Sequence, residues 1–146
     1  MKKALRLLAS ALLVAVLCFP ALPGRAEAAQ FTFDASTGSI TGYTGPGGDV
    51  VVPDSIGGRA VERIGQNAFN GNRDITSVEL PAGIRRIEHS AFYFCENLRQ
   101  VNLPEGLEVI GPYALFSCEK LEQLEVPASV AYIGDQAVAG CYSLRG

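Results

Sequence analysis

The chain has 146 residues, a formal net charge of -3, 48% hydrophobic residues and 18% charged residues. This length permits one ordinary domain and excludes a large multidomain enzyme. Nucleic-acid binding depends on clustered Lys and Arg, and the chain has 12 of these against 15 acidic residues, so nucleic acid is not an expected partner. The apolar content suffices for a buried core, which charge-rich disordered chains lack.

The first 28 residues have the pattern of a secretory signal peptide. Two lysines and an arginine form a positive start, an apolar run covers residues 7–19, and Ala26 and Ala28 are the small residues before an expected cleavage after Ala28. A helix of this run rises about 20 Å, less than the roughly 30 Å hydrocarbon core, which favours a cleaved signal over a membrane anchor. Cys18 follows a leucine, where lipoprotein signals have a small residue, so lipid attachment is not expected.

Cleavage after Ala28 removes four of the 12 bases and one of the 15 acids, which leaves 8 bases, 14 acids and a net charge of -6. It also leaves three cysteines, Cys95, Cys118 and Cys141. Because three is odd, at least one thiol has no partner within the exported chain. No later segment is predicted to span a membrane.

The segment after the signal predicts a β-hairpin that caps the N-terminal end of the fold. Residues 31–33 and 39–43 alternate in polarity, and residues 34–38 have the composition of a turn. The glycines of residues 45–48 lack the Lys-Ser/Thr of a phosphate-binding loop, so we interpret them as turn residues.

A period of 23 residues organises the chain after residue 60. Four columns recur at this spacing, namely Ile64, Ile87, Ile110 and Ile133; Ala68, Ala91, Ala114 and Ala137; Pro81, Pro104 and Pro127; and Cys95, Cys118 and Cys141, with Asn72 in the equivalent earlier place. Residues 98–104 alternate like a short strand that ends at proline. Residues 87–95 have the apolar spacing of one or two helical turns, which predicts a short helical or irregular return.

One such unit buries too few side chains to offset the conformational entropy of its residues. Stacked units about 4.8 Å apart bury continuous apolar ladders and pair their strands as a parallel sheet. We therefore predict an α/β repeat solenoid, a right-handed coil with short parallel strands and a 23-residue period.

Residues 87–104 follow the pattern I-G-x-x-A-F-x-x-C-x-x-L-x-x-V-x-L-P with Glu88 at the glycine position, and this pattern resembles the BspA-type bacterial leucine-rich repeat. The resemblance covers residues 50–146, and residues 40–53 resemble the segment that opens such arrays. It departs from the pattern at Asn72, at Val138 and at residues 56–61. We divide the chain into a signal peptide (1–28), an N-terminal β cap with the first strand (29–53) and leucine-rich repeats with an incomplete last repeat (54–146).

The resemblance implies a bacterial protein that is secreted or lies at the cell surface and recognises other proteins or host material, and that is not an enzyme. Protein contact or adhesion is the first functional prediction. The alternatives are a carbohydrate- or matrix-binding module, or a piece of a larger secreted adhesin or enzyme. No cofactor is expected.

For each residue with a reactive side chain, a purely structural role is weighed against a role in a disulfide, a metal site or a catalytic site. The cysteine column fits a ladder of small buried hydrophobes better than disulfides, because side chains in register keep their β-carbons wider than a disulfide prefers. Zinc sites use closely spaced cysteine pairs, which this chain lacks. His89, beside Glu88 and Ser90, is interpreted as a solvated histidine, since adjacent residues on an exposed return do not converge on one point.

Two surfaces are candidate partner-binding sites. The first is the predicted outward face of the strands, with the residues Ser77, Glu79, Arg99, Gln100, Asn102, Glu122, Gln123 and Glu125. Leucine-rich repeats generally bind there, but the face has few of the residue types that anchor binding, so an ordinary solvated face is the alternative. The second surface consists of Tyr93, Phe94, Tyr113 and Phe116, at positions where other coils carry small or polar residues. These rings either pack locally across the returns or form a contact patch.

The end of the chain predicts self-association. After Leu144 the repeat stops before the Val-x-Leu-Pro of the earlier units, so residues 121–126 are expected to form an open edge. An open edge leaves backbone groups and ladder side chains uncovered. We expect residues 29–146 to self-associate, either as a fragment of a longer array or as half of an end-to-end assembly.

Overall fold

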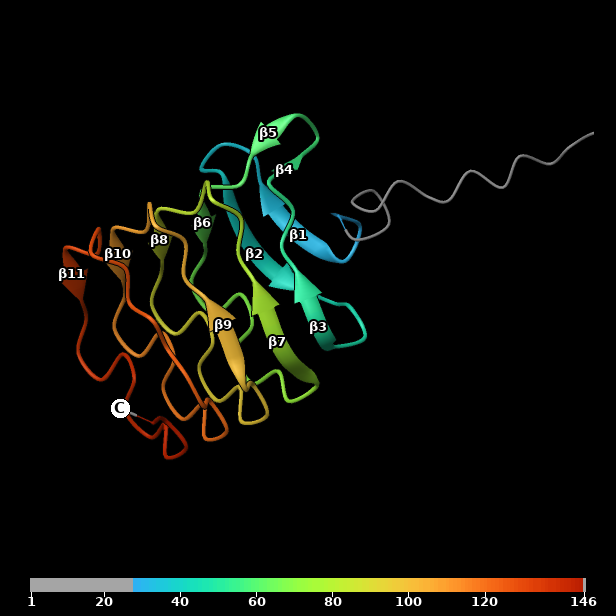
Figure 1. Ribbon diagram of the computed structural model, residues 1–146. Helices are drawn as coiled ribbons and strands as arrows, with labels where there is room; N and C mark the ends of the chain where they lie inside the picture. Colours follow the sequence, from blue (N-terminus) through green and yellow to red (C-terminus); the bar gives the residue numbers. More distant parts are fainter. Residues whose placement is uncertain (1–27, 146) are drawn as a thin grey trace, which may run out of the picture.

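The computed structural model describes residues 28–145, so the predicted signal peptide lies outside the described residues. Within residues 31–145 the regular elements are eleven β-strands and no helix. The strands are β1 (Phe31–Asp34), β2 (Ser39–Tyr43), β3 (Gly48–Val51), β4 (Ser55–Ile56), β5 (Arg59–Ala60), β6 (Arg63–Ile64), β7 (Ile75–Glu79), β8 (Arg86–Ile87), β9 (Gln100–Asn102), β10 (Val109–Ile110) and β11 (Tyr132–Ile133). They wind into coils stacked along one axis (Figure 1).

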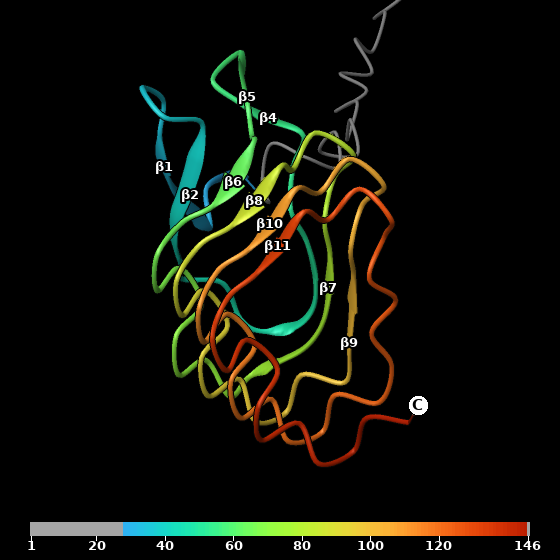
Figure 2. The ribbon, with the colours of Figure 1, turned by 90° about the vertical axis from the view of Figure 1, so that its left-hand side faces the viewer.

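Each coil contributes to two sheets on opposite sides of the stack (Figure 2). One sheet has the strand order β1-β2-β6-β8-β10-β11, the other has the order β3-β7-β9, and β4 and β5 form a separate small hairpin. The strands of neighbouring coils pair in parallel with a register shift of one repeat, so Ile87 lies opposite both Ile64 and Ile110. The predicted solenoid with a 23-residue period is therefore confirmed.

The core lies between the two sheets and consists of the repeated apolar columns. The isoleucines of β6, β8 and β10 are fully buried, as are Ala91, Ala114, Leu98 and Leu121. The rings of Phe69 and Phe92, one repeat apart, stack at 4.9 Å. Identical positions in successive coils thus bury one another, which a single coil cannot do alone.

Of the two forms predicted for the return of residues 87–95, short helical or irregular, the irregular one is found. Residues 86–87 form β8, and the following residues make turns whose amides bond to the next coil, as from Phe92 N to Ala114 O at 2.7 Å and from Phe94 N to Phe116 O at 2.9 Å. Two left-handed residues in each return prevent a continuous helix. They form two further columns at the 23-residue spacing, Asn67, Ser90, Tyr113 and Gln136, and Gly71, Phe94, Ser117 and Gly140.

The predicted N-terminal hairpin is confirmed as a cap. β1 and β2 pair antiparallel, and β2 joins the larger sheet by pairing in parallel with β6. The rings of Phe31 and Tyr43 lie 6.4 and 5.4 Å from the ring of Phe69, so the hairpin covers the first apolar layer of the stack. At the other end of the stack, β11 is the last strand of the larger sheet (Figure 1).

Candidate functional site

Five rings from two neighbouring coils meet on the returns, and we call them the aromatic cluster: His89, Tyr93, Phe94, Tyr113 and Phe116. Tyr93 and Phe116 occupy equivalent positions and stack at 5.1 Å with 15° between their planes. Phe94 meets both edge-on, at 4.5 and 5.9 Å. Tyr113 lies 5.7 Å from both Phe116 and the exposed His89. The sequence alone did not place His89 with these rings.

The aromatic cluster lies at the surface and not in the core. Phe94 is 37% exposed, and Tyr93, Tyr113 and Phe116 are half-buried. The flanking coils have Asn70 and Ala139 in the place of the stacked pair. The sequence left two interpretations of these rings, local packing across the returns and a contact patch. The rings do pack on one another across the returns, and they also present apolar surface to solvent. The two interpretations are therefore compatible.

Two of these rings stand on backbone that disfavours large side chains. Phe94 has a φ of 54° and Tyr113 a φ of 55°, both in the left-handed region. The equivalent positions hold Gly71 and Gly140 in one column and Asn67 in the other, which are residue types that tolerate this conformation. A left-handed bulky residue costs about 1–2 kcal/mol. The folding of a coil does not require these rings, since other coils make the same turn without them.

The smaller sheet presents two polar columns, as predicted. Ser77 lies beside Gln100, which is bridged to Gln123, and Glu79 lies beside Asn102 in the column that continues to Glu125. Two open hollows lie side by side on this face, and both are lined by Gln100 and Asn102.

Four of the predicted residues on this face are engaged within the chain. Asn102 accepts a hydrogen bond from the amide of Leu80 at 2.7 Å and donates one to its carbonyl at 3.3 Å. Ser77 donates to Asp49 at 2.6 Å. Arg99 pairs with Glu122 at 3.2 Å. The side chains of Glu79, Gln100, Gln123 and Glu125 remain exposed.

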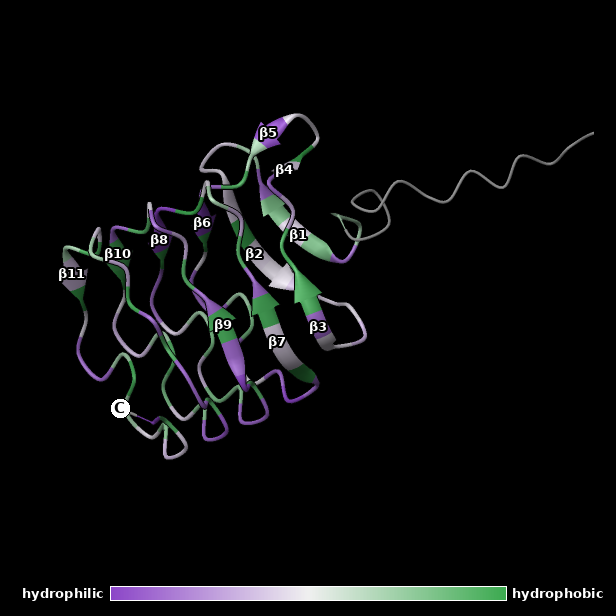
Figure 3. Cartoon of the chain, viewed as in Figure 1, coloured by the Kyte–Doolittle hydropathy of each residue, from purple (hydrophilic) through white to green (hydrophobic). Residues whose placement is uncertain are grey.

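One ion pair and one charge-assisted hydrogen bond, each between residues one repeat apart, also follow the corner turns of the coils. Arg73 pairs with Glu96 at 2.7 Å, and Lys120 donates to Asn97 at 2.6 Å. Successive turns along this edge have the hydrophilic colouring in Figure 3. Since these pairs are exposed, each stabilises the fold by no more than about 1 kcal/mol.

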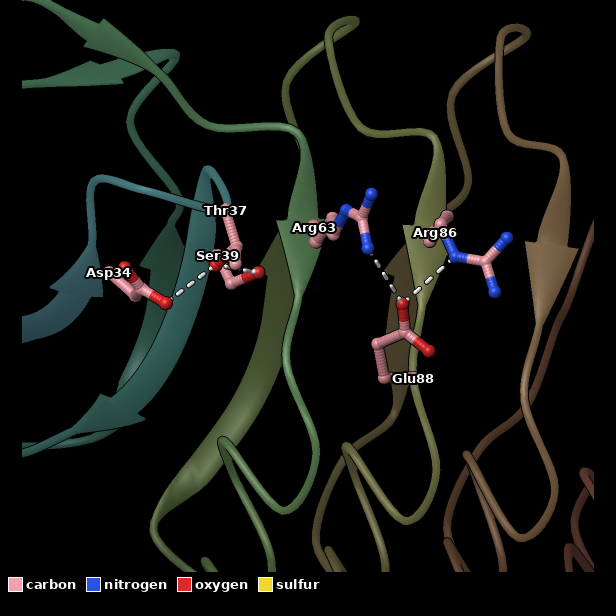
Figure 4. Close-up of polar contacts among 6 residues, drawn as sticks. All are labelled: Asp34, Thr37, Ser39, Arg63, Arg86 and Glu88. Carbon is pink, nitrogen blue, oxygen red and sulfur yellow. Dashed lines mark hydrogen bonds and ion pairs between the residues drawn. The ribbon is translucent and has the colours of Figure 1, made fainter.

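The larger sheet carries a charged group that the sequence patterns did not single out. Glu88 lies between two arginines, 2.9 Å from Arg86 Nε and 3.7 Å from Arg63 Nη1 (Figure 4). Asp34, in the hairpin turn, accepts hydrogen bonds from Ser36 and Thr37. These bonds hold the pKa of Asp34 below its usual value. Both groups are internally satisfied and do not point into a pocket together.

The cysteines form the predicted ladder of small buried side chains. Each thiol donates to a carbonyl oxygen 26 residues earlier, Cys95 to Phe69 at 3.1 Å, Cys118 to Phe92 at 3.2 Å and Cys141 to Leu115 at 3.2 Å. Cys95 and Cys118 are fully buried, and Cys141 is half-buried. All three are free thiols in this structure.

The described residues show no arrangement that suggests bound metal. Residues 28–145 contain no group of three or more His, Cys, Asp or Glu side chains able to hold a metal ion. In the same part of the chain every buried side-chain N or O atom has a hydrogen-bond partner. No helix in that part is long and apolar enough to cross a membrane.

The family model for the BspA type leucine rich repeat region matches residues 57–146 in 6 copies. A leucine-rich repeat protein of T. pallidum is 30% identical with a TM-score of 0.61, over 79% of this chain and 65% of that one. One from Bacteroides capillosus is also 30% identical, with a TM-score of 0.62, over 65% of this chain and 74% of that one. No curated protein matches the chain.

The pneumococcal vaccine antigen PcpA has the same fold, with a TM-score of 0.68 at 22% identity. The alignment covers 79% of this chain but 28% of the antigen. The chain therefore spans less than two thirds of both the T. pallidum protein and the pneumococcal antigen.

Proposed function

Because the chain belongs to the BspA-type leucine-rich repeat family, we propose that it is a bacterial protein-interaction module, secreted or held at the cell surface, that catalyses no reaction. The signal-like first 28 residues support export. The repeat architecture supports binding, since solenoids of this kind present extended surfaces to partners.

The aromatic cluster is the proposed contact site for a partner protein. The single observation that carries this proposal is that Phe94 and Tyr113 place large rings at left-handed positions, which other coils give to Gly, Asn, Ser or Gln. Rings kept at a conformational cost, and not needed for the turn, are more readily explained by binding than by folding. Tyr and Phe are also common anchors of protein interfaces.

The geometry of the rings favours a protein partner over a sugar. Aromatic side chains hold sugars against an open ring face, whereas Tyr93 and Phe116 are stacked face to face on each other. Phe94, which is 37% exposed and meets both rings edge-on, remains available to a partner. Such surfaces suit apolar and aromatic side chains that approach edge-on.

The test is to probe residues 29–146 against arrays of host proteins, cell-envelope proteins and glycans, and to repeat the measurement with Phe94→Gly and Phe116→Ala. These variants install residues that other coils already use, Gly71 and Ala139. We expect binding to at least one protein to weaken more than tenfold in each variant. The thermal midpoint should change by only a few degrees: in Phe94→Gly the lost ring contacts are offset by relief of the left-handed backbone, and in Phe116→Ala the ring that is lost lies at the surface and outside the core.

Gln100→Ala is the matched control, since it removes an exposed side chain from the smaller sheet and leaves the aromatic cluster intact. Protein binding lost in Gln100→Ala and retained in Phe94→Gly would move the site to the sheet face. Binding to glycans alone would overturn the proposed function. A large fall in the midpoint of Phe94→Gly would show that the ring is structural.

A further inference from the structure

The first coil contains an extension that the later coils do not have. Pro53 and Ile64 are eleven residues apart, whereas Pro81 and Ile87, at the equivalent positions, are six apart. The additional residues form the small hairpin of β4 and β5, which stands beside the turn that joins β1 and β2 (Figure 1). The later coils turn the same corner without such a hairpin, so the repeat fold does not require it.

The extension forms one wall of a hollow of about 440 Å³. The turn of residues 35–38 forms another wall, and β6 begins beside it. The carbonyl of Gly38 accepts hydrogen bonds from the amides of Glu62 and Arg63, at 2.8 and 3.1 Å. These bonds join the cap turn to the first coil, so the hollow is a fixed feature of the fold.

Two guanidinium groups line this hollow from different elements, Arg59 from β5 and Arg63 from β6. Arg59 is exposed and has no ion pair within residues 28–145. Arg63 lies 3.7 Å from the carboxylate of Glu88, which is longer than a hydrogen bond. Both arginines therefore have N–H donors free for a ligand.

The charges around the hollow favour an anion. Glu62 also lines it, so the two arginines leave one net positive charge there, in a chain whose net charge is -3. The hydroxyls of Ser36 and Thr37 donate to Asp34, so the donors that remain for a ligand are those of the guanidinium groups. Guanidinium groups bind carboxylates and phosphates through paired N–H donors.

The next coil shows which anion fits beside these arginines. The carboxylate of Glu88 lies between Arg86 and Arg63, two arginines one repeat apart (Figure 4). Gly65 and Gly111 hold the equivalent position in the flanking coils. A carboxylate one coil earlier would lie beside Arg63 on the side of the cap, and the first coil supplies none there because it has Gly65.

We propose that the hollow binds an acidic segment of a partner protein, with a carboxylate group between Arg59 and Arg63. The bound carboxylate takes the place beside Arg63 that Glu88 takes on its other side. This site shares no residue with the aromatic cluster and has a different chemistry, so it stands independently of the contact proposed there.

The test measures the binding of a fluorescent hexaglutamate peptide to residues 29–146, a segment that contains the buried core from Phe31 to Ala137. We expect hexaglutamate to bind at least about tenfold more tightly than hexaglutamine, and to bind more weakly as salt is added. Arg59→Gln and Arg63→Gln should each weaken this binding about fivefold or more, because each removes a charged hydrogen-bond donor.

Arg99→Gln is the matched control, since it removes the same charge from an exposed arginine elsewhere on the chain. Phe94→Gly should also leave hexaglutamate binding unchanged, which separates this test from that of the aromatic cluster. The position of the peptide is measured by nuclear magnetic resonance, in which the amide signals of residues 36–38 and 59–63 should shift when hexaglutamate is added.

Three outcomes would overturn the proposal: hexaglutamine binding as tightly as hexaglutamate, an equal loss of binding in Arg99→Gln and Arg59→Gln, or displacement of the peptide by an equal concentration of inorganic phosphate. The last would show a general anion site. If the thermal midpoint of Arg63→Gln falls because its contact with Glu88 is lost, Arg59→Gln decides the test, since Arg59 has no such contact among the described residues.

Discussion

The cysteines show how one residue position serves every coil. A buried thiol fills the space of a small apolar side chain and uses its hydrogen to satisfy a backbone carbonyl, as Cys95 does with Phe69. Burial raises the pKa of Cys95 from 9.0 to about 12. The neighbouring Cys141 thiol and burial together raise the pKa of Cys118, whereas the nearby Cys118 thiol lowers the pKa of Cys141. The buried thiols of Cys95 and Cys118 therefore stay protonated at neutral pH, which makes them unreactive.

The raised pKa of Cys95 predicts a loss of stability in alkali. The folded state keeps its thiol proton above pH 9, where the unfolded chain releases it, so the contribution is complete below pH 9 and declines between pH 9 and 12. The expected slope is about 1.4 kcal/mol per pH unit in the free energy of unfolding. Urea denaturation of the wild type and of Cys95→Ala at several pH values should show a flatter alkaline decline in the variant.

Cys141→Ala is the control for this measurement, because the pKa of Cys141 is lowered and not raised. It should keep the part of the slope between pH 9 and 12 that comes from Cys95, because burial and not Cys141 raises the pKa of Cys95. Equal slopes in the wild type and in Cys95→Ala would contradict the assignment of this pH dependence to Cys95.

At the scale of elements, the hydrogen bonds of Asn102 predict a structural role for a residue that the sequence offered as a binding residue. Its amide group satisfies both the N–H and the C=O of Leu80, a residue that is 3% exposed. Asn102→Ala should lower the free energy of unfolding by about 1–3 kcal/mol, because both backbone groups lose their partner. Chemical denaturation measures this loss.

Gln100→Ala, two residues earlier on β9, is the matched control, since its side chain is exposed. It should change the stability by less than about 0.5 kcal/mol. If Asn102→Ala were as mild as Gln100→Ala, the bonds to Leu80 would not stabilise this strand end.

The sequence predicts the strands of the smaller sheet and fails on the larger one for a physical reason. Residues 98–103 alternate long enough to show a period of two, whereas β6, β8, β10 and β11 have two residues each and carry no period. The apolar spacing of Ile87, Ala91, Phe92 and Cys95 suggests a helix, but tight turns with left-handed residues produce the same spacing. The sequence did contain a sign of these turns. Asn67, Gly71 and Gly140 lie at the left-handed positions and are residue types that favour positive φ.

The aromatic cluster was predictable as surface because its positions change character between coils. Tyr93 and Phe116 replace Asn70 and Ala139, and a core position does not alternate in this way. The backbone conformation of Phe94 and Tyr113 was not predictable from those replacements alone. It depends on inter-coil bonds such as that from Phe94 N to Phe116 O, which only the three-dimensional stack defines.

At the scale of the molecule, the stack is a one-dimensional array in which each coil depends on its neighbours. The hairpin closes one end of the described stack, and Ile133 and Val138 are partly exposed in the last described coil. The same residue type at the same repeat position therefore has a different environment in each coil. Substitutions at equivalent positions of successive coils therefore measure how strongly neighbouring coils stabilise each position.

The isoleucines at positions 64, 87, 110 and 133 are such a set of equivalent positions, and they lead to a final prediction. Ile87 has a coil on both sides and is 0% exposed, whereas Ile133 has a coil on one side and is 51% exposed. Ile87→Ala should lower the free energy of unfolding by about 2–5 kcal/mol, as cavities in well-packed cores do, and Ile133→Ala by about 1 kcal/mol. Denaturation at low protein concentration measures both, with Ile110→Ala expected to match Ile87→Ala. Equal losses at Ile87 and Ile133 under dilute conditions would mean that coil neighbours do not set the stability of the column.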